Sequence, residues 1–196
     1  FIETAKEESL EALLRAREIH PDKKIILAGC LSERYAKELS TEMTEADFFF
    51  GNGDLSKIKL VVKNLFPDFD TPSYEEFRFL KPPQEGVSTA ERTEFFNFPA
   101  SAYIKITEGC DNRCSFCAIP LIRGSLRSRS IEEIKAEVLE LLDKGIYEIN
   151  LIGQDLASFG KGLLDIHTQN ENTFPLYDLL KSLLDIKKNF WIRLLY

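Results

Sequence analysis

The sequence has few sulfur-containing residues and no long apolar run. Its 196 residues include four Cys, one Met and one Trp. Four Cys are too few for a disulfide scaffold in a chain of this length. No stretch approaches the roughly 18 consecutive apolar residues of a membrane span, and the N-terminus lacks the basic-then-apolar layout of a signal peptide. We therefore expect a cytoplasmic protein with no membrane association.

The composition excludes disordered and collagen-like chains. Apolar residues make up 44% of the sequence and charged residues 29%, close to the average of soluble globular proteins, so the chain should bury a core. The length admits one large or two small domains. There is no initiator Met, and residues 190–196 have the pattern of a buried strand that ends without a turn. We expect a fragment cut at both sides, which alone would be inactive.

Helical and strand patterns alternate over residues 1–67. Thr4 with Glu7 three residues later predicts the start of the first helix, and Asp54 is a predicted cap of the last one. The expected elements are a helix over 4–20, a strand over 24–28, a helix over 31–39, a strand over 47–50 and a helix from 54 to about 65. This order predicts an α/β domain with a parallel sheet.

The pattern is lost over residues 68–98, which we interpret as a linker. Five of the eight prolines lie between residues 67 and 99. Four aromatic residues in this stretch either pack a short hairpin or belong to the core of a neighbouring domain: Phe77, Phe79, Phe95 and Phe96.

A second α/β pattern occupies residues 99–196. The expected elements are strands over 102–107, 147–152 and 189–196 and helices over 131–144 and 174–186. Such alternation is typical of a βα-barrel or an open parallel sheet. Because three strands cannot close a barrel, we predict an open half or an incomplete barrel. Four acidic residues on the first of these helices predict a solvated face: Glu132, Glu133, Glu137 and Glu140.

Three thiols form the strongest chemical feature. Cys110, Cys114 and Cys117 are separated by three and two residues on the predicted loop that leaves a strand. Thiolates hold iron-sulfur clusters and soft metals, and three ligands would leave one iron open. A structural zinc site needs a fourth ligand, and because neither His20 nor His167 is near in sequence it would have to recruit Cys30. Cluster, zinc and unliganded thiols remain the alternatives.

The carboxyl ends of parallel strands are where α/β proteins place reactive centres. The cysteine loop and the loop over 153–162 both follow predicted strands, so we expect them to meet at one rim. Gln154 and Asp155 are placed there for cofactor or substrate contact, although a strand-end Asp is as often a cap.

Several motifs around the thiols resemble the radical S-adenosylmethionine (SAM) domain of methylthiotransferases. They are the Tyr-Ile-Lys-Ile-Thr-Glu-Gly-Cys string over 103–110, the cysteine spacing with Phe116, Ile119-Pro120, Arg123-Gly124 and Ser128-Arg129. The resemblance implies a four-iron four-sulfur (4Fe-4S) cluster on Cys110, Cys114 and Cys117, whose open iron chelates SAM. We expect cofactor contacts from Phe116, Gln154, Arg123 and Arg129, and we assign no catalytic side chain.

Cys30 lies in the string Gly-Cys-Leu-Ser-Glu-Arg-Tyr over 29–35. A single Cys at a strand end is more often a buried structural thiol. The string resembles the third cluster cysteine of the amino-terminal methylthiotransferase domain, which implies a second 4Fe-4S cluster. We expect the other two cysteines to precede Phe1. In that family one SAM serves radical formation, and a second methylates the sulfur that is transferred.

Two related activities share this layout. One modifies adenosine in transfer RNA (tRNA), and the other modifies the β-carbon of an aspartate in a small-subunit ribosomal protein. Residues 1–9, 30–35 and the Gly-Gln-Asp string at 153–155 are more similar to the protein-modifying type. We therefore predict a ribosomal protein substrate and a reductant such as a flavodoxin or ferredoxin. A tRNA substrate is the first alternative, and a non-catalytic zinc-binding module is the second.

Charge favours the protein substrate. Residues 1–99 carry 13 basic and 19 acidic side chains (net −6), and residues 100–196 carry 12 and 13 (net −1), unlike a nucleic-acid surface. The exception is 112–130, with four Arg and no acid. Guanidinium groups bind carboxylates, so these Arg are candidates for the SAM carboxylate or an acidic substrate side chain. The alternative, which we weigh equally for any single Arg, is that its guanidinium forms an ion pair with Glu108, Asp111 or Asp155.

Overall fold

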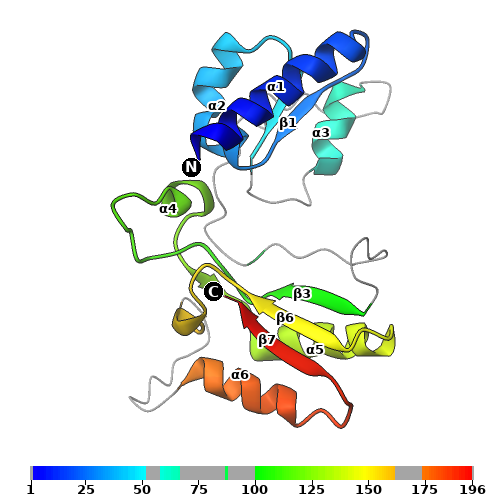
Figure 1. Cartoon of the computed structure of the whole chain (residues 1–196), viewed down its shortest axis with the longest axis vertical. Helices are drawn as coiled ribbons and strands as arrows, with labels where there is room; N and C mark the ends of the chain where they lie inside the picture. Colours follow the sequence, from blue (N-terminus) through cyan, green and yellow to red (C-terminus); the bar gives the residue numbers. More distant parts are fainter. Residues whose placement is uncertain (1, 52–57, 67–86, 88–99, 162–173, 196) are drawn as a thin grey trace. The chain divides into compact units, whose positions relative to one another are not determined.

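The structure, a computed structural model, describes residues 2–51, 58–66, 87, 100–161 and 174–195. The chain divides into two compact units. Phe1–Pro83 with Arg113–Arg123 make up the first unit, and Gln84–Asn112 with Gly124–Tyr196 make up the second. Each unit combines helices with parallel strands (Figure 1), which confirms the predicted fold class. Apart from Val87, the predicted linker and its four Phe lie outside the described residues.

The first unit is built on two short parallel strands. Its elements are α1 (Glu3–Ile19), β1 (Ile26–Ala28), α2 (Cys30–Glu42), β2 (Phe48–Phe50) and α3 (Ile58–Leu65). Ile26 pairs with Phe48 and Ala28 with Phe50. Phe49 packs in a cluster with Leu13 of α1 and residues of α2, whereas Phe48 and Phe50 pack with Val61 of α3. Because successive side chains of a strand face opposite sides, β2 is buried on both of its faces, whereas β1 is only partly buried.

The predicted end of α1 is confirmed and its predicted cap is wrong. His20 is the C-cap residue, and its backbone N–H donates to the Ala16 carbonyl at 2.9 Å. At the other end the N-cap residue is Ile2, with no side-chain cap hydrogen bond. Since the helix already begins at Glu3, Thr4 lies inside the first turn and cannot act as the cap. Asp54, the predicted cap of α3, lies outside the described residues.

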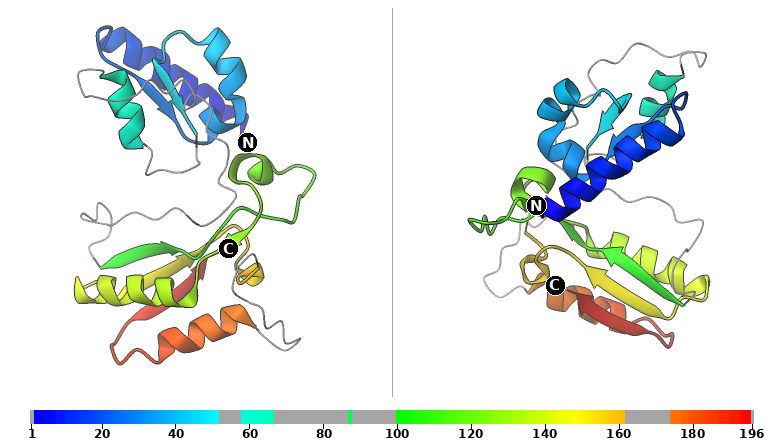
Figure 2. Two further views of the ribbon diagram at one scale, coloured as in Figure 1. Left: turned by 180° about the vertical axis from the view of Figure 1, so that it is seen from behind. Right: turned by 45° about the horizontal axis from the view of Figure 1, so that its top comes forward.

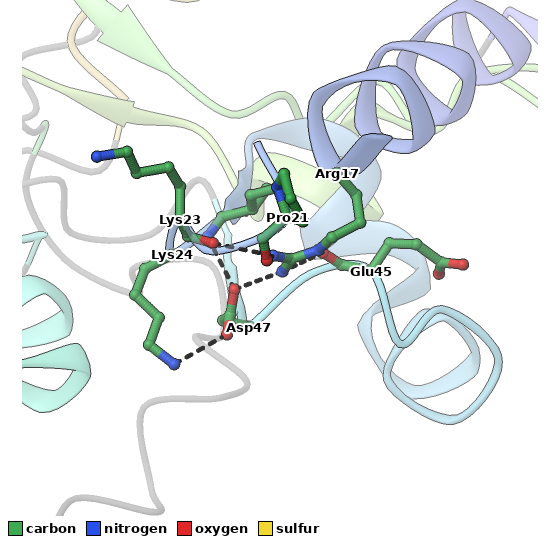
Figure 3. Close-up of polar contacts among 7 residues, drawn as sticks. Arg17, Pro21, Lys23, Lys24, Glu45 and Asp47 are labelled. Atoms are coloured by element: carbon green, nitrogen blue, oxygen red, sulfur yellow. Dashed lines mark hydrogen bonds and ion pairs between the residues drawn. The ribbon is translucent and has the colours of Figure 1, made fainter. Parts of the chain in front are cut away.

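Arg17, near the end of α1, joins that helix to the starts of both strands (Figure 3). Its guanidinium donates to Asp47 Oδ2 at 2.7 Å and to the carbonyls of Glu45, Pro21 and Lys23 at 2.8 to 3.0 Å. Asp47 Oδ2 also accepts from the Ile25 backbone N–H at 2.9 Å. That bond, with those from Arg17 and Lys24, lowers the pKa of Asp47 to about 2. The carboxylate therefore joins three segments that are distant in sequence.

The second unit contains a three-stranded parallel sheet in the order β3-β6-β7. The strands are β3 (Ser101–Lys105), β6 (Glu148–Ile152) and β7 (Trp191–Leu195), and the helices are α5 (Ile131–Asp143) and α6 (Pro175–Leu184). Ile104, Ile149 and Leu151 are fully buried in one core with residues of both helices, such as Val138 and Leu179. Figure 2 shows the same sheet and helices from two further directions. Ser130 and Glu133 form a capping box at the start of α5.

The last strand is not buried as predicted. In β7 the Trp191 side chain is 70% exposed and Leu194 is 45% exposed. Ile192 of β7 packs against the core of this unit. β7 pairs with β6 alone and forms an edge of the described sheet, so no second described strand covers its other side. Among the described residues, no helix is both long and apolar enough to span a membrane.

Candidate metal centre

A short antiparallel pair closes the base of the cysteine loop. β4 (Thr107–Glu108) pairs with β5 (Arg127–Ser128). Just beyond this pair, the Cys110 N–H donates to the Gly124 carbonyl at 3.2 Å. The Leu126 N–H donates to Asp111 Oδ1, also at 3.2 Å. The loop therefore leaves and returns to the second unit at a fixed point.

Gly109 makes this closure possible. Its φ of +80° lies in the left-handed region that favours glycine. A Cβ at this position would lie 2.1 Å from the Ser125 carbonyl oxygen and 2.6 Å from that of Gly124. Both neighbours are backbone atoms, so no side chain can move aside. The Gly before the first cysteine is thus required by the close approach of the two ends of the loop.

The four cysteines, all among the described residues, form no disulfide. Cys114 is exposed, and Cys110, Cys117 and Cys30 are half-buried. The Cys117 N–H donates to the Cys114 carbonyl at 3.0 Å, and between the first two cysteines Arg113 has a left-handed φ of 48°. Within the described part of the chain, no three His, Cys, Asp or Glu side chains are grouped as a metal site. The chemistry of the donor set fits a thiolate-bound metal, which Cys110, Cys114 and Cys117 would hold.

The prediction that Cys30 ends a strand is wrong, because β1 ends at Ala28 and Cys30 is the first residue of α2. Gly29 precedes it with a φ of +110°. In this position the thiol lies at the carboxyl end of a parallel strand, where α/β proteins place functional groups. Its role in a second cluster stays a prediction.

Two of the four Arg of the loop form ion pairs inside the second unit. Arg127 Nη2 lies 3.9 Å from Glu108 Oε2, and Lys105 Nζ lies 3.2 Å from Glu108 Oε1. The alternative that an Arg here pairs with Glu108 is therefore confirmed. Arg129 Nη1 lies 2.5 Å from Glu137 Oε2. Glu137 is consequently not part of the solvated face that the sequence predicted for α5.

The two strand-end loops meet at one rim, as predicted. Asn112 Nδ2 of the cysteine loop donates to Asp155 Oδ2 at 3.1 Å. A Cβ on Gly153, directly after β6, would lie 2.2 Å from Thr107 Oγ1. The Gly160 N–H donates to Ser128 Oγ at 2.9 Å. These contacts join the ends of β3 and β6 and leave no room for a side chain at position 153.

The predicted cofactor contacts occupy different surroundings. Phe116 is 87% exposed and Gln154 is exposed, whereas Arg123 is half-buried. Arg129 is buried, and its guanidinium also donates to the Lys105 carbonyl at 3.2 Å. The assignment of these four residues to SAM stays a prediction.

Sequence reasoning missed Asn112 as the partner of Asp155. The two residues are 43 positions apart, and neither belongs to a periodic pattern. The sequence predicts that the cysteine loop and the loop over 153–162 meet, but this prediction does not specify which atoms form the hydrogen bond. Asp155 was expected either to contact a cofactor or to act as a cap. Its carboxylate also accepts from Ser158 Oγ at 2.7 Å, which is a local, turn-forming contact.

Comparison with known proteins extends over both units. Residues 104–188 match the model of the radical SAM superfamily. Residues 1–51 match the uncharacterized protein family UPF0004.

Three relatives named ribosomal protein uS12 methylthiotransferase RimO match the whole of this chain. The relative of Treponema denticola is 52% identical, that of Desulforamulus reducens 42% and that of Thermodesulfovibrio yellowstonii 40%. The chain spans 43%, 42% and 40% of these relatives, respectively. The chain thus combines a radical SAM match over residues 104–188 and a three-thiol loop with similarity along its entire length to proteins named as methylthiotransferases.

Proposed function

We propose that the protein is a methylthiotransferase that adds a methylthio group to the β-carbon of an aspartate in ribosomal protein uS12. The observation that carries the proposal is the 52% identity over the whole chain to a relative with that ribosomal protein in its name. The free thiols of the cysteine loop support it, because they are the donor set that this chemistry requires.

Two 4Fe-4S clusters and SAM are the proposed cofactors. Cys110, Cys114 and Cys117 would hold the first cluster, and Cys30 would contribute one ligand to the second. With SAM bound, the first cluster supplies the one-electron chemistry that activates an unreactive C–H bond. The residues of this chain are proposed to bind these cofactors and to orient them. Gly109 and the β4–β5 pair fix the base of the loop, and Gln154, Phe116 and Arg123 are proposed to contact SAM.

The ion pair of Arg129 with Glu137 limits what that Arg can do. A guanidinium has several donors, and those not used by Glu137 and the Lys105 carbonyl are proposed to bind the SAM carboxylate. Glu137 then keeps the guanidinium in a fixed orientation. Because both groups belong to the second unit, this arrangement does not depend on the first.

Acidic net charge favours a protein substrate over tRNA. Neither half of the sequence has the basic excess that phosphate contacts require, with net charges of −6 and −1. The four Arg over 112–130 are the exception, and two of them are neutralised by Glu108 and Glu137. A flavodoxin or ferredoxin is the proposed reductant, and the cytoplasm is the proposed location.

Mass spectrometry of both substrates tests the proposal. The full-length gene is supplied to a strain that lacks its own uS12 and tRNA methylthiotransferases. Aspartate in uS12 should gain one methylthio group while tRNA adenosine stays unmodified, and Cys114→Ala should abolish the product. Methylthioadenosine with unmodified uS12 would establish the tRNA activity instead. One zinc and negligible iron in the anaerobically isolated protein would favour the zinc-binding module.

A further inference from the structure

Asp155 lies where the two strand-end loops meet. It follows β6 by three residues, and its Oδ2 accepts hydrogen bonds from Asn112 Nδ2 at 3.1 Å and from Ser158 Oγ at 2.7 Å. Hydrogen bonds from Ser158 and Asn112 lower the pKa of Asp155, so the carboxylate is ionised near neutral pH. Both bonds are then charge-assisted, which makes them stronger than bonds between neutral groups.

The carboxylate is anchored to the core of the second unit. Ser158 ends a 3₁₀ turn, Leu156–Ser158. The side chains of Leu156 and Phe159, on either side of that turn, are 5% and 2% exposed and belong to the hydrophobic core of this unit. Lys161 Nζ donates to Ser158 Oγ at 3.4 Å. Asp155 is therefore a fixed point, whereas Asn112 is an exposed residue of the loop.

Asn112 is the midpoint between two predicted cluster ligands. One residue, Asp111, separates it from Cys110 and one, Arg113, from Cys114. The Cys110 end is held by the Gly124 carbonyl, and the Asn112 side chain adds a second attachment further along the loop. Arg113, directly before Cys114, has a left-handed φ of 48°. Two attachments on either side of Asp111 restrict the conformations that the segment samples.

We propose that Asp155 is a positioning residue for the cysteine loop. By accepting the hydrogen bond from Asn112, it orders the segment between Cys110 and Cys114 before any metal is bound. Metal binding then costs less conformational entropy, because part of the ordering is already done. What the loop binds rests on the proposed function. The hydrogen bond itself joins two residues of the second unit.

Hydrogen–deuterium exchange of the metal-free, reduced full-length protein tests the ordering. Asp155→Ala and Asn112→Ala should each raise the exchange rate of the amides at 111–114 by about three- to tenfold, the range for loss of one exposed charge-assisted bond. The double variant should exchange no faster than either single one. The control is Asp143→Ala, which removes the acid of an exposed ion pair with Lys188 in the same unit. It should leave the exchange rates of these amides unchanged.

Reversal of the pair separates positioning from a merely structural effect. Asn112→Asp alone places two carboxylates together and should raise exchange, whereas Asn112→Asp with Asp155→Asn restores a hydrogen bond of opposite polarity and should return exchange to within about twofold of wild type. After anaerobic loading, the reversed pair should also recover the electron paramagnetic resonance line shape that the single variants lose.

Additive effects of the two alanine variants, or unchanged exchange in Asp155→Ala, would overturn the proposal. So would a reversed pair that exchanges as fast as Asn112→Asp. These outcomes are measured without metal, so they remain decisive if the loop binds zinc instead of a cluster. Failure of the proposed function would appear instead as an absent methylthio product while the variants still show the exchange rates predicted above.

Discussion

Arg129 Nη1 lies 2.5 Å from Glu137 Oε2, so the residue directly after β5 is joined to α5 by an ion pair. The side chains of Arg129 and Glu137 are only 8% and 18% exposed. The sequence predicted a cofactor contact for the first and a solvated position for the second. Their pairing instead fixes the point at which the cysteine loop returns to the sheet.

Removal of one partner of this pair should destabilise the second unit. Glu137→Ala leaves the Arg129 guanidinium buried without its carboxylate, and we expect a loss of about 3 kcal/mol in the free energy of unfolding. Urea unfolding of the metal-free protein measures it. The control is Glu140→Ala, which breaks an exposed pair with Lys144 and should cost less than about 1 kcal/mol. Equal losses for the two variants would contradict a structural role for Glu137.

Gly109→Ala should disturb the base of the cysteine loop. The new Cβ would meet the Ser125 carbonyl oxygen at 2.1 Å in a left-handed conformation, so we expect iron loading to fall several-fold and stability to drop by at least about 2 kcal/mol. Gly145→Ala is a matched control, since its φ is +86° but no atom lies within 4 Å of the added Cβ. It should cost about 1 kcal/mol and leave iron loading unchanged. A similar loss of iron in both would show that the close approach at Gly109 is unimportant.

Acid should weaken the first unit through Asp47. Its pKa of about 2 is below the ordinary 3.8, so the ionised carboxylate contributes stability above about pH 4, and the contribution is lost as pH falls through about 2. The shift corresponds to about 2 kcal/mol at neutral pH. Unfolding measured between pH 6 and about pH 2 should show this loss, and Asp47→Asn should remove it. Lys24→Ala, at a half-exposed partner, should change stability little. A pH dependence that persists in Asp47→Asn would contradict the assignment.

Local patterns predicted the elements that have a strong period. The buried strands with β-branched or aromatic runs, such as Phe48–Phe50, and the amphipathic α5 lie within a few residues of their predicted bounds. The two-residue strands β4 and β5 carry no period and were not predicted. β7 has the composition of a buried strand, but burial depends on what covers it, which a strand's own residues do not encode.

The site was predictable in its chemistry more than in its contacts. The cysteine spacing indicated the donor set, and the strand-end rule predicted the rim where Asn112 meets Asp155. Which atoms pair there depends on the tertiary arrangement of residues 43 positions apart. Likewise, the Arg129–Glu137 pair forms because β5 returns to the start of α5, and nothing in the helical period of Glu137 distinguishes it from its solvated neighbours.

We propose that Cys110, Cys114 and Cys117 hold a cluster that cleaves SAM. The most direct measurement is of iron, sulfide and 5′-deoxyadenosine after anaerobic reconstitution of the full-length protein, its Cys114→Ala variant and its Cys30→Ala variant. We predict that Cys114→Ala forms no 5′-deoxyadenosine, while Cys30→Ala still cleaves SAM and loses part of its iron. SAM cleavage that persists in Cys114→Ala would contradict the account.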